Sequence, residues 1–332
     1  MNPKTSDYLS KLKIAATLNV VMVHSMNLTG YANYTQFNFL LNFFDIIAAT
    51  GVPIFFAVSG YLLFAKEFKW RDNMKKKCRT LLVPFLIWNL FWLLFDIIGS
   101  LVLPDYFSSI PLTDFPELIK AFFGTPFDDS PYYVPLWFVR DLFLLNAVAP
   151  LLKKAIDRLP VWVTAVVLAA CFFLLPYRMW YKFGQSISFF ILGGILARKR
   201  FSFNFGKPAK FTAVICAVLV AASAFLPALD RKSLLWRLPL ILAFAAICIA
   251  LAFCDFKKVS AMLTFSFPIY VLHGKILSVV QIVYTKLIAQ NTLTVTIGYF
   301  VLPLAVVLIC ISAALILKKL LPLPYRIATG ER

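Results

Sequence analysis

Residues 294–317 read TVTIGYFVLPLAVVLICISAALIL, a run of 24 residues without one charged side chain. At a rise of about 1.5 Å per residue, a helix of this length crosses the roughly 30 Å hydrocarbon core of a bilayer. Lys318 and Lys319 follow immediately, as basic residues do at the cytoplasmic end of a membrane span. The stretch therefore indicates an integral membrane protein.

The rest of the chain repeats this pattern. Of its 332 residues, 61% are hydrophobic and 14% are charged, far from a soluble composition. The apolar runs are too long, and alternate too little, for the strands of a membrane barrel. We predict an all-α bundle of about ten transmembrane helices that forms a single domain over residues 1–332. The expected spans are residues 14–30, 38–65, 80–103, 136–152, 160–177, 184–197, 211–227, 234–254, 260–287 and 294–317.

The basic residues predict the orientation of these spans. An even number of spans puts both termini on one side, and that side then carries 24 of the 33 Lys and Arg residues, against six on the other. The positive-inside rule places the N and C termini in the cytoplasm. It also explains the net charge of +18 without a nucleic-acid partner.

The longest segment on the opposite side, about residues 104–135, is rich in acidic residues and proline. We predict that it forms a structured cap over an outward cavity. The six cysteines include no pair in the outer loops and no CxxC spacing, so neither a disulfide framework nor a metal site is expected.

Both histidines of the chain, His24 and His273, fall inside predicted spans. Counted from the cytoplasmic ends of their runs, they lie ~18 and ~21 Å deep, which places them in one layer. An ionisable side chain inside a span costs roughly 2.5–3.5 kcal/mol, so such residues face a cavity, a partner or a substrate. A structural hydrogen bond between helices is the alternative for either ring.

Lys13 adds a cation to the first of these helices. It precedes His24 by eleven residues, close to three helical turns, so both side chains share one face ~17 Å apart. The alternative for Lys13 is an ordinary interfacial anchor.

Four segments of the chain follow a recognisable order. They are Lys13 to His24 with ten residues between, residues 52–61 (VPIFFAVSGY), residues 135–141 (PLWFVRD) and residues 266–273 (SFPIYVLH). This order resembles the acyltransferase-3 family of bacterial membrane O-acyltransferases, and it extends from the first to the ninth span. Two positions depart from the family pattern: Lys13 replaces the commoner Arg, and Leu142 stands where many members carry Glu.

The resemblance implies an enzyme of the bacterial inner membrane that moves an acyl group, usually acetyl, from cytoplasmic acyl-CoA to a hydroxyl of an extracytoplasmic or lipid-linked glycan. Acetyl-CoA would be the donor substrate, with no permanently bound cofactor or metal. His24 is the expected general base, because neutral imidazole, with a pKa of about 6.5, can accept the hydroxyl proton. His273, together with Tyr270, would stabilise the thioester oxyanion or position the acceptor.

The donor's phosphates require cations at the cytoplasmic face. The candidates are Lys13, Lys69, Arg71, Lys75 and Arg79. Positive-inside topology or contact with anionic lipids is the alternative for this cluster.

Six further polar or aromatic residues are candidates for binding the acceptor: Ser59, Asp45, Asp96, Trp137, Arg140 and Asp141. Each has an alternative. Arg140 can form an interhelical ion pair with Asp96 or Asp45. Ser59 and Gly60 can form a close helix contact. Trp137 can belong to an interfacial aromatic belt.

A transporter or flippase for a glycan or lipid-linked precursor remains the alternative function. Such proteins usually rest on repeated halves with broken helices, and the two halves of this sequence show no matching repeat. Membrane lipids are expected partners, and assembly into a homo-oligomer is left open.

Overall fold

The computed structural model describes residues 3–25, 39–67, 69–102, 115–124, 130–175, 183–201, 203–225, 233–254 and 263–331. Within these ranges the chain forms helices and no strand. The helices are α1 (Pro3–His24), α3 (Phe39–Ala48), α4 (Gly51–Phe64), α5 (Trp70–Lys77), α6 (Val83–Val102), α7 (Phe115–Phe123), α8 (Trp137–Ala147), α9 (Ala149–Arg158), α10 (Val161–Leu174), α12 (Gln185–Arg198), α13 (Lys207–Ala224), α14 (Leu234–Ala252), α16 (Ser266–Leu287), α17 (Thr292–Leu320) and α18 (Pro322–Thr329). A π-helical turn, η2 (Cys78–Leu82), joins α5 to α6, and a 3-10 turn, η3 (Val134–Leu136), precedes α8.

Within the described residues, each of the ten predicted apolar runs overlaps helical structure. Six helical segments are long and apolar enough to cross a membrane: Phe39–Phe64, Trp70–Val102, Lys207–Ala224, Leu235–Ala252, Ser266–Leu287 and Thr292–Leu320. Residues 134–158, bent by 64° between α8 and α9, make a seventh if the pair is one span. The apolar helices α10 and α12 have 14 residues each, and the first half of α1 is rich in charge. A multi-pass helical protein is thus confirmed, whereas ten spans stay a prediction.

Two of the predicted spans are interrupted at prolines. Pro150 lies in the first turn of α9, and Pro53 in the first turn of α4. Proline has no N–H to donate to the preceding turn, and its ring displaces the carbonyl four residues earlier. It is tolerated at the start of a helix for the same reason. Each predicted run is therefore divided into two helices.

Glycines bring α4 and α12 into close contact. A Cβ on Gly60 would overlap the carbonyl oxygen of Phe190, and one on Gly193 would overlap the carbonyl oxygen of Ala57. Small residues allow two membrane helices to approach until their backbones touch, where packing rather than the hydrophobic effect holds them. The helix-contact interpretation of the Ser59-Gly60 pair is confirmed.

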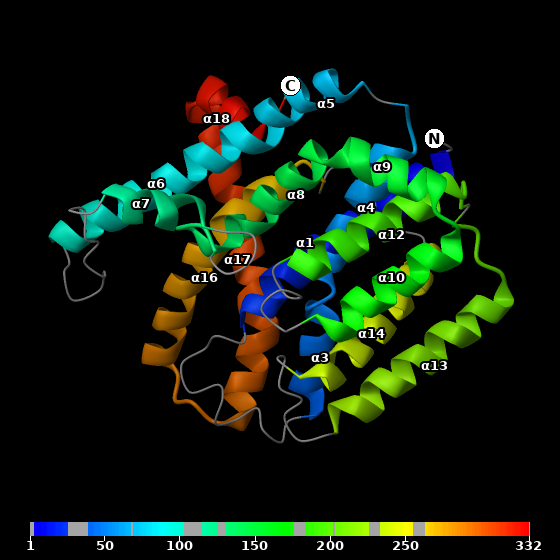
Figure 1. Cartoon of the computed structure of the whole chain (residues 1–332). Helices are drawn as coiled ribbons and strands as arrows, with labels where there is room; N and C mark the ends of the chain where they lie inside the picture. The colour runs from blue at the N-terminus through cyan, green and yellow to red at the C-terminus, as the bar shows by residue number, and fades with distance from the viewer. Residues whose placement is uncertain are drawn as a thin grey trace.

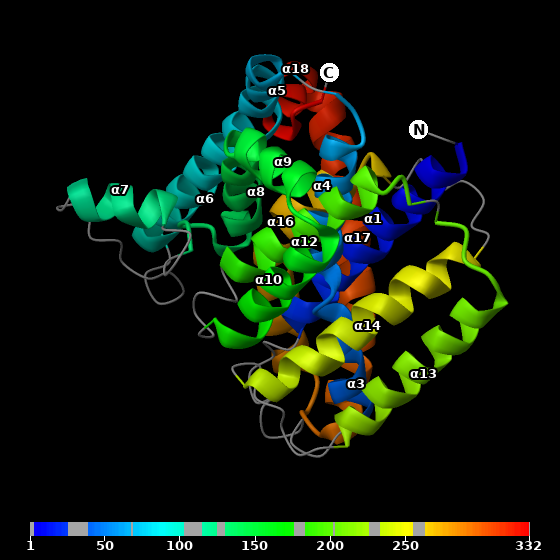
Figure 2. The same cartoon turned by 45° about the vertical axis from the view of Figure 1, so that its right-hand side comes forward.

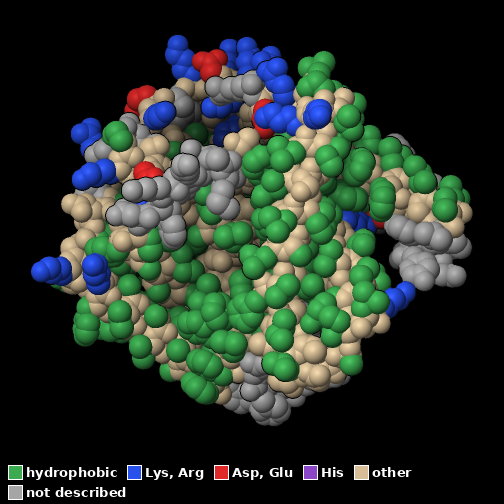
Figure 3. Space-filling view, turned by 180° about the vertical axis from the view of Figure 1, so that it is seen from behind, with side chains coloured by type: hydrophobic (Ala, Val, Ile, Leu, Met, Phe, Trp, Pro, Cys, Tyr) green, Lys and Arg blue, Asp and Glu red, His purple; other side chains and the backbone are tan. Residues whose placement is uncertain are grey.

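Both termini lie at the same end of the molecule, together with α5 and α18 (Figure 1). Lys and Arg side chains gather at this end, while hydrophobic side chains cover most of the visible flank (Figure 3). On one side α13 and α14 pack along each other, and α7 projects from the opposite side (Figure 2). The arrangement agrees with the positive-inside pattern, and the orientation relative to the membrane stays a prediction.

The predicted cap is described only in part, because residues 103–114 and 125–129 lie outside the described residues. Within it, the end of α7 packs on α6, where Phe122 and Phe123 contact Phe85 with ring centroids 6.4 and 6.1 Å away. The described part therefore packs beside α6, and its role as a cap over a cavity stays a prediction.

The close contact at Gly193 predicts how a larger side chain there would change stability. Gly193→Ala forces α4 and α12 apart, and overpacking of this kind costs roughly 1–3 kcal/mol, so we expect the Tm in detergent to fall by about 5 °C. Gly206→Ala is the matched control, because its Cβ would meet only the Pro208 ring carbon at 3.6 Å. Equal Tm values for the two variants would show that the helix contact contributes little.

Candidate functional site

The two histidines lie side by side. The rings of His24 and His273 have centroids 5.2 Å apart and are tilted by 43°. His24 is the last residue of α1, and His273 lies in the first half of α16. Their matched depths predicted this proximity, although 249 residues separate them in the sequence. The two rings are thus close neighbours where α1 ends against α16.

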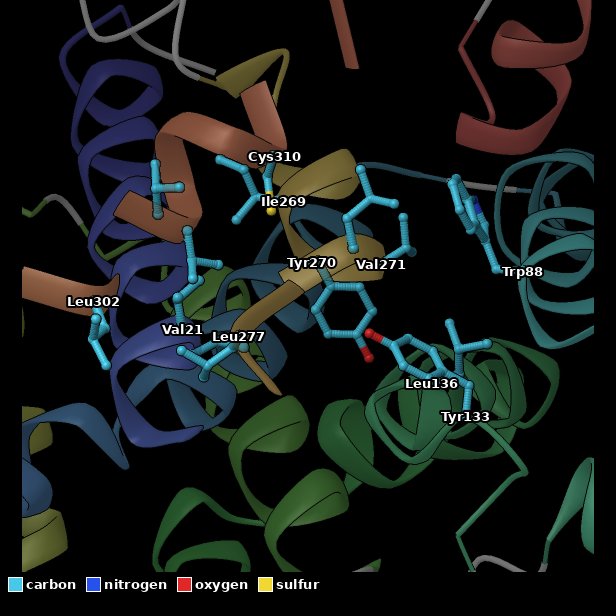
Figure 4. Packing of buried hydrophobic residues seen from close by; sticks show 14 of the residues in the cluster. Val21, Trp88, Tyr133, Leu136, Ile269, Tyr270, Val271, Leu277, Leu302 and Cys310 are labelled. Atoms are coloured by element: carbon cyan, nitrogen blue, oxygen red, sulfur yellow. The ribbon is translucent and has the colours of Figure 1, made fainter. Parts of the chain in front are cut away.

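Contacts between α1 and α16 hold the pair together. The side-chain amide of Gln281 donates to the carbonyl oxygens of His24, at 3.5 Å, and Ser25, at 3.4 Å. These carbonyls belong to the end of α1, where helix geometry leaves them without an intrahelical donor. Val21 of α1 and Leu277 of α16 pack in the same buried cluster (Figure 4). The sequence analysis missed Gln281, although an amide inside an apolar span is a visible signal.

The surroundings of His273 decide its tautomer. Its Nδ1 lies 2.7 Å from the carbonyl oxygen of Tyr270 and 3.2 Å from that of Ile269. Because carbonyl oxygens only accept, Nδ1 must carry the proton, which leaves a lone pair on Nε2. The ring is fully buried, and Nε2 has no hydrogen-bond partner within the described residues. This geometry supports positioning of the acceptor, because a neutral ring in this tautomer has no Nε2 proton to offer an oxyanion.

Tyr270 connects the histidines to the segment that begins α8. Its hydroxyl donates to the carbonyl oxygen of Pro135, and its ring centroid lies 6.1 Å from that of His273. In Figure 4 the hydroxyl groups of Tyr270 and Tyr133 point toward one another. With its own proton used in this contact, Tyr270 acts as a positioning residue for α16.

Two polar contacts that the sequence analysis missed fix the same part of α16, and a third one holds Tyr133, which makes one of them. The Tyr133 hydroxyl accepts from the backbone N–H of Gly274 at 3.2 Å. The Trp92 indole donates to the carbonyl oxygen of Val271 at 3.1 Å, and Asn89 accepts from the backbone N–H of Tyr133 at 2.8 Å. Trp92 and Asn89 were visible as polar groups in the apolar run of α6. Their hydrogen-bond partners could not be predicted, because the partners depend on how each helix is rotated about its axis.

Aromatic contacts link the motif segments into one cluster. Phe138 of α8 lies 5.6 and 4.7 Å from Phe55 and Phe56 of α4, and 5.7 Å from Tyr270, measured between ring centroids. Tyr270 in turn contacts His273, which faces His24. The structure thus brings together the segments that carry the four motifs.

Asp96 forms an ion pair with Lys275. The Lys275 ammonium lies 2.8 and 2.7 Å from the two carboxylate oxygens of Asp96, and the Tyr132 hydroxyl donates to the same carboxylate at 2.8 Å. The alternative that paired Asp96 with Arg140 is wrong. Through Lys275, which is two residues after His273, Asp96 holds α6 to α16. A role of Asp96 in binding a substrate stays a prediction.

Arg140 pairs instead with its neighbour. Its Nε and Nη2 atoms each lie 3.0 Å from Oδ1 of Asp141, and its Nη1 donates to the Phe123 carbonyl at 3.2 Å. The other oxygen of Asp141 accepts from Ser186 of α12 at 3.1 Å. Both charged residues are buried, so this pair joins α7, α8 and α12 inside the protein.

The remaining acceptor candidates are dispersed. Asp45 is buried on α3, the helix that packs against α13 and α14. Trp137 is half-buried and lies 6.2 Å from Phe56 between ring centroids, so it packs in the protein interior. Ser59 is half-buried on α4. Substrate binding by these three residues stays a prediction.

Two of the predicted donor-binding residues border a pocket. Lys75 and Arg79 line a pocket of about 780 Å³ at the end that carries both termini, whereas Lys69 and Arg71 are exposed and do not line it. Lys13 is half-buried on α1 and lies close enough to Lys77 to repel its charge. The cations of α1 and α5 therefore converge at this end of the molecule.

Comparison with known proteins assigns a family to this arrangement. Residues 7–313 match the acyltransferase domain that defines acyltransferase-3 proteins. The chain belongs to the acyltransferase-3 family. All four motif segments, from Lys13 to His273, lie inside the matched range, as do the unusual Lys13 and Leu142.

A curated relative adds a biological setting. The succinoglycan biosynthesis protein ExoH of Rhizobium meliloti (strain 1021) is 30% identical over 211 residues, which cover 59% of this chain and 55% of that protein. The chain thus matches about half the length of this relative. No solved structure matches the chain.

The ion pair next to the histidines can be tested for a structural role. Lys275→Met leaves the Asp96 carboxylate without its cation, and breaking a buried pair costs up to about 3–5 kcal/mol, less here because Lys275 is partly exposed. We expect a clearly lower Tm for Lys275→Met and recovery of most of the loss in the double variant Lys275→Met/Asp96→Leu. If the double variant regains its Tm but not acyl transfer, Asp96 also contacts the substrate.

Proposed function

We propose that this protein is a membrane O-acyltransferase. It moves acetyl, or another short acyl group, from cytoplasmic acyl-CoA to a hydroxyl of an extracytoplasmic or lipid-linked glycan. The observation that carries the proposal is the pair His24–His273, two rings 5.2 Å apart among the segments that hold the family motifs. His273 is buried and His24 is half-buried, and imidazoles inside an apolar bundle are costly to maintain unless the rings have partners or a reaction to perform.

The pair suits proton removal from an alcohol. A sugar hydroxyl is a weak nucleophile at neutral pH, so a base must take its proton as the oxygen attacks. His24 accepts this proton while the new C–O bond forms at the thioester carbonyl. The C–S bond then breaks, and coenzyme A leaves as the thiolate. His273, held by the carbonyls of Tyr270 and Ile269, presents its Nε2 lone pair to a neighbouring hydroxyl of the glycan and so positions the acceptor.

The basic end of the molecule has the charge needed to bind the donor. Coenzyme A carries phosphates, and the cations of α1 and α5 gather at the end that we assign to the cytoplasm. Its flexible pantetheine arm would extend along α1 from Lys13 toward His24. The Rhizobium relative is named for the biosynthesis of succinoglycan, which supports a glycan acceptor.

The base can be tested by removing one ring. His24→Ala deletes the proton acceptor, so we expect transfer of labelled acetyl from acetyl-CoA by purified protein to fall about 10²- to 10⁴-fold. Ser278→Ala is the control, because Ser278 is exposed on α16 and its hydroxyl donates to the Gly274 carbonyl one turn earlier in the same helix. Full activity of a well-folded His24→Ala variant would refute the assignment.

The orientation can be tested with single cysteines. Position 289 lies in the turn between α16 and α17, and position 319 lies near the other end of α17. In a background without the six native cysteines, Ala289→Cys should react with an impermeant thiol reagent in intact cells, and Lys319→Cys should react only after lysis. The opposite pattern would invert the proposed topology.

A further inference from the structure

The pocket at the basic end has a wall that the sequence analysis did not consider. On one side lie α5 and η2, which contribute Lys75, Lys76 and Arg79. On the other side lies α18, which contributes Arg326. The volume of about 780 Å³ is within the range of sites that bind ligands of the size of a nucleotide. Two helices distant in sequence thus enclose one basic concavity.

Specific contacts hold α18 in this position. The Trp88 indole of α6 donates to the carbonyl oxygen of Ala328 at 2.8 Å. Gly330 ends α18 with a φ of +66°, and a Cβ there would lie 2.9 Å from the Cα of Thr80 in η2. A left-handed residue in backbone contact with its neighbour requires glycine. The end of α18 is therefore fixed against the turn that carries Arg79.

Cations outnumber carboxylates among the described residues that line the pocket. Four cations, Lys75, Lys76, Arg79 and Arg326, face two carboxylates, Asp72 and Glu331. Glu331 is also held by Lys318, which lies outside the pocket, at 3.3 Å. Cations gathered on a concave surface repel one another, and a multivalent anion relieves that repulsion. Lysine and arginine together are the usual ligands of phosphate groups.

The π-helical turn shapes this surface. In η2 the backbone is wound wider than in an α-helix, and consecutive residues Arg79 and Thr80 both line the pocket. Single π-helical turns inside longer helices are frequently found at functional sites. This one lies directly opposite Gly330 of the α18 wall.

We propose that this pocket binds the phosphate groups of the acyl donor's nucleotide, and that Arg326 of α18 is one of its binding residues. The assignment rests on the proposed function, which supplies acyl-CoA as the donor. Residues 322–329 lie beyond the range that matches the family, so family membership alone gives α18 no role.

The test uses the full chain in nanodiscs of neutral lipid and titrates coenzyme A by calorimetry. A charge-assisted contact to phosphate at an exposed site predicts that Arg326→Gln raises the Kd about five- to tenfold, with a larger effect at low salt. Arg326→Lys keeps the charge and should recover part of the loss. Lys319→Gln is the matched control, because Lys319 is an exposed cation of the same region that does not line the pocket.

An unchanged Kd for coenzyme A in Arg326→Gln would overturn the proposal. If that variant also retains less phosphatidylglycerol in mixed nanodiscs, the pocket is a lipid headgroup site instead. Acetyl-CoA turnover separates this proposal from the proposed function. A wild-type protein without turnover refutes the function, whereas normal turnover with an unaltered KM in Arg326→Gln refutes only the pocket.

Discussion

The contact between α1 and α16 places the only two histidines of the chain next to each other, and the rest of the candidate site is arranged around it. The contact is polar where α1 ends, since the Gln281 amide donates to the carbonyls of His24 and Ser25, which have no donor in the next turn of a helix. It is apolar elsewhere, where Val21 and Leu277 share one buried cluster. A bilayer supplies no water to these groups, so each polar atom must find its partner inside the protein.

This constraint explains why so many hydrogen bonds converge on one turn of α16. Trp92, Tyr133 and Tyr270 each bond to the backbone of α16 or join that helix to η3, and none of them is charged. Together they fix the rotation of α16, and through it the direction of His273. The ring is also oriented by two carbonyls of its own helix. The precision of the site therefore comes from neutral donors on neighbouring helices, while the one nearby ion pair fastens α16 to α6.

The part of this organisation that sequence could predict follows helical periodicity and hydrophobicity. The ten apolar runs, the shared depth of His24 and His273 and the small-residue contact at Gly60 depend on spacing within one helix. The partner of Asp96 depends on the rotation of α6 relative to α16, so Lys275 was not expected to hold it. The same holds for Arg326, which comes to line one pocket with Arg79 only when α18 folds back on η2. The residues that bind the acceptor are the hardest to predict, because a buried charged residue can equally well form an ion pair or hydrogen bond between helices.

The pairing of Asp96 with Lys275 has a consequence for how the protein is made. The two residues are 179 positions apart, so α6 leaves the ribosome long before its cation exists. During that interval the carboxylate must be hydrated or shielded by the insertion machinery, because an isolated charge in lipid is costly. Arrival of α16 then neutralises the charge and, in the same event, delivers His273 to His24. Completion of the histidine pair is thereby tied to a late step of membrane biogenesis.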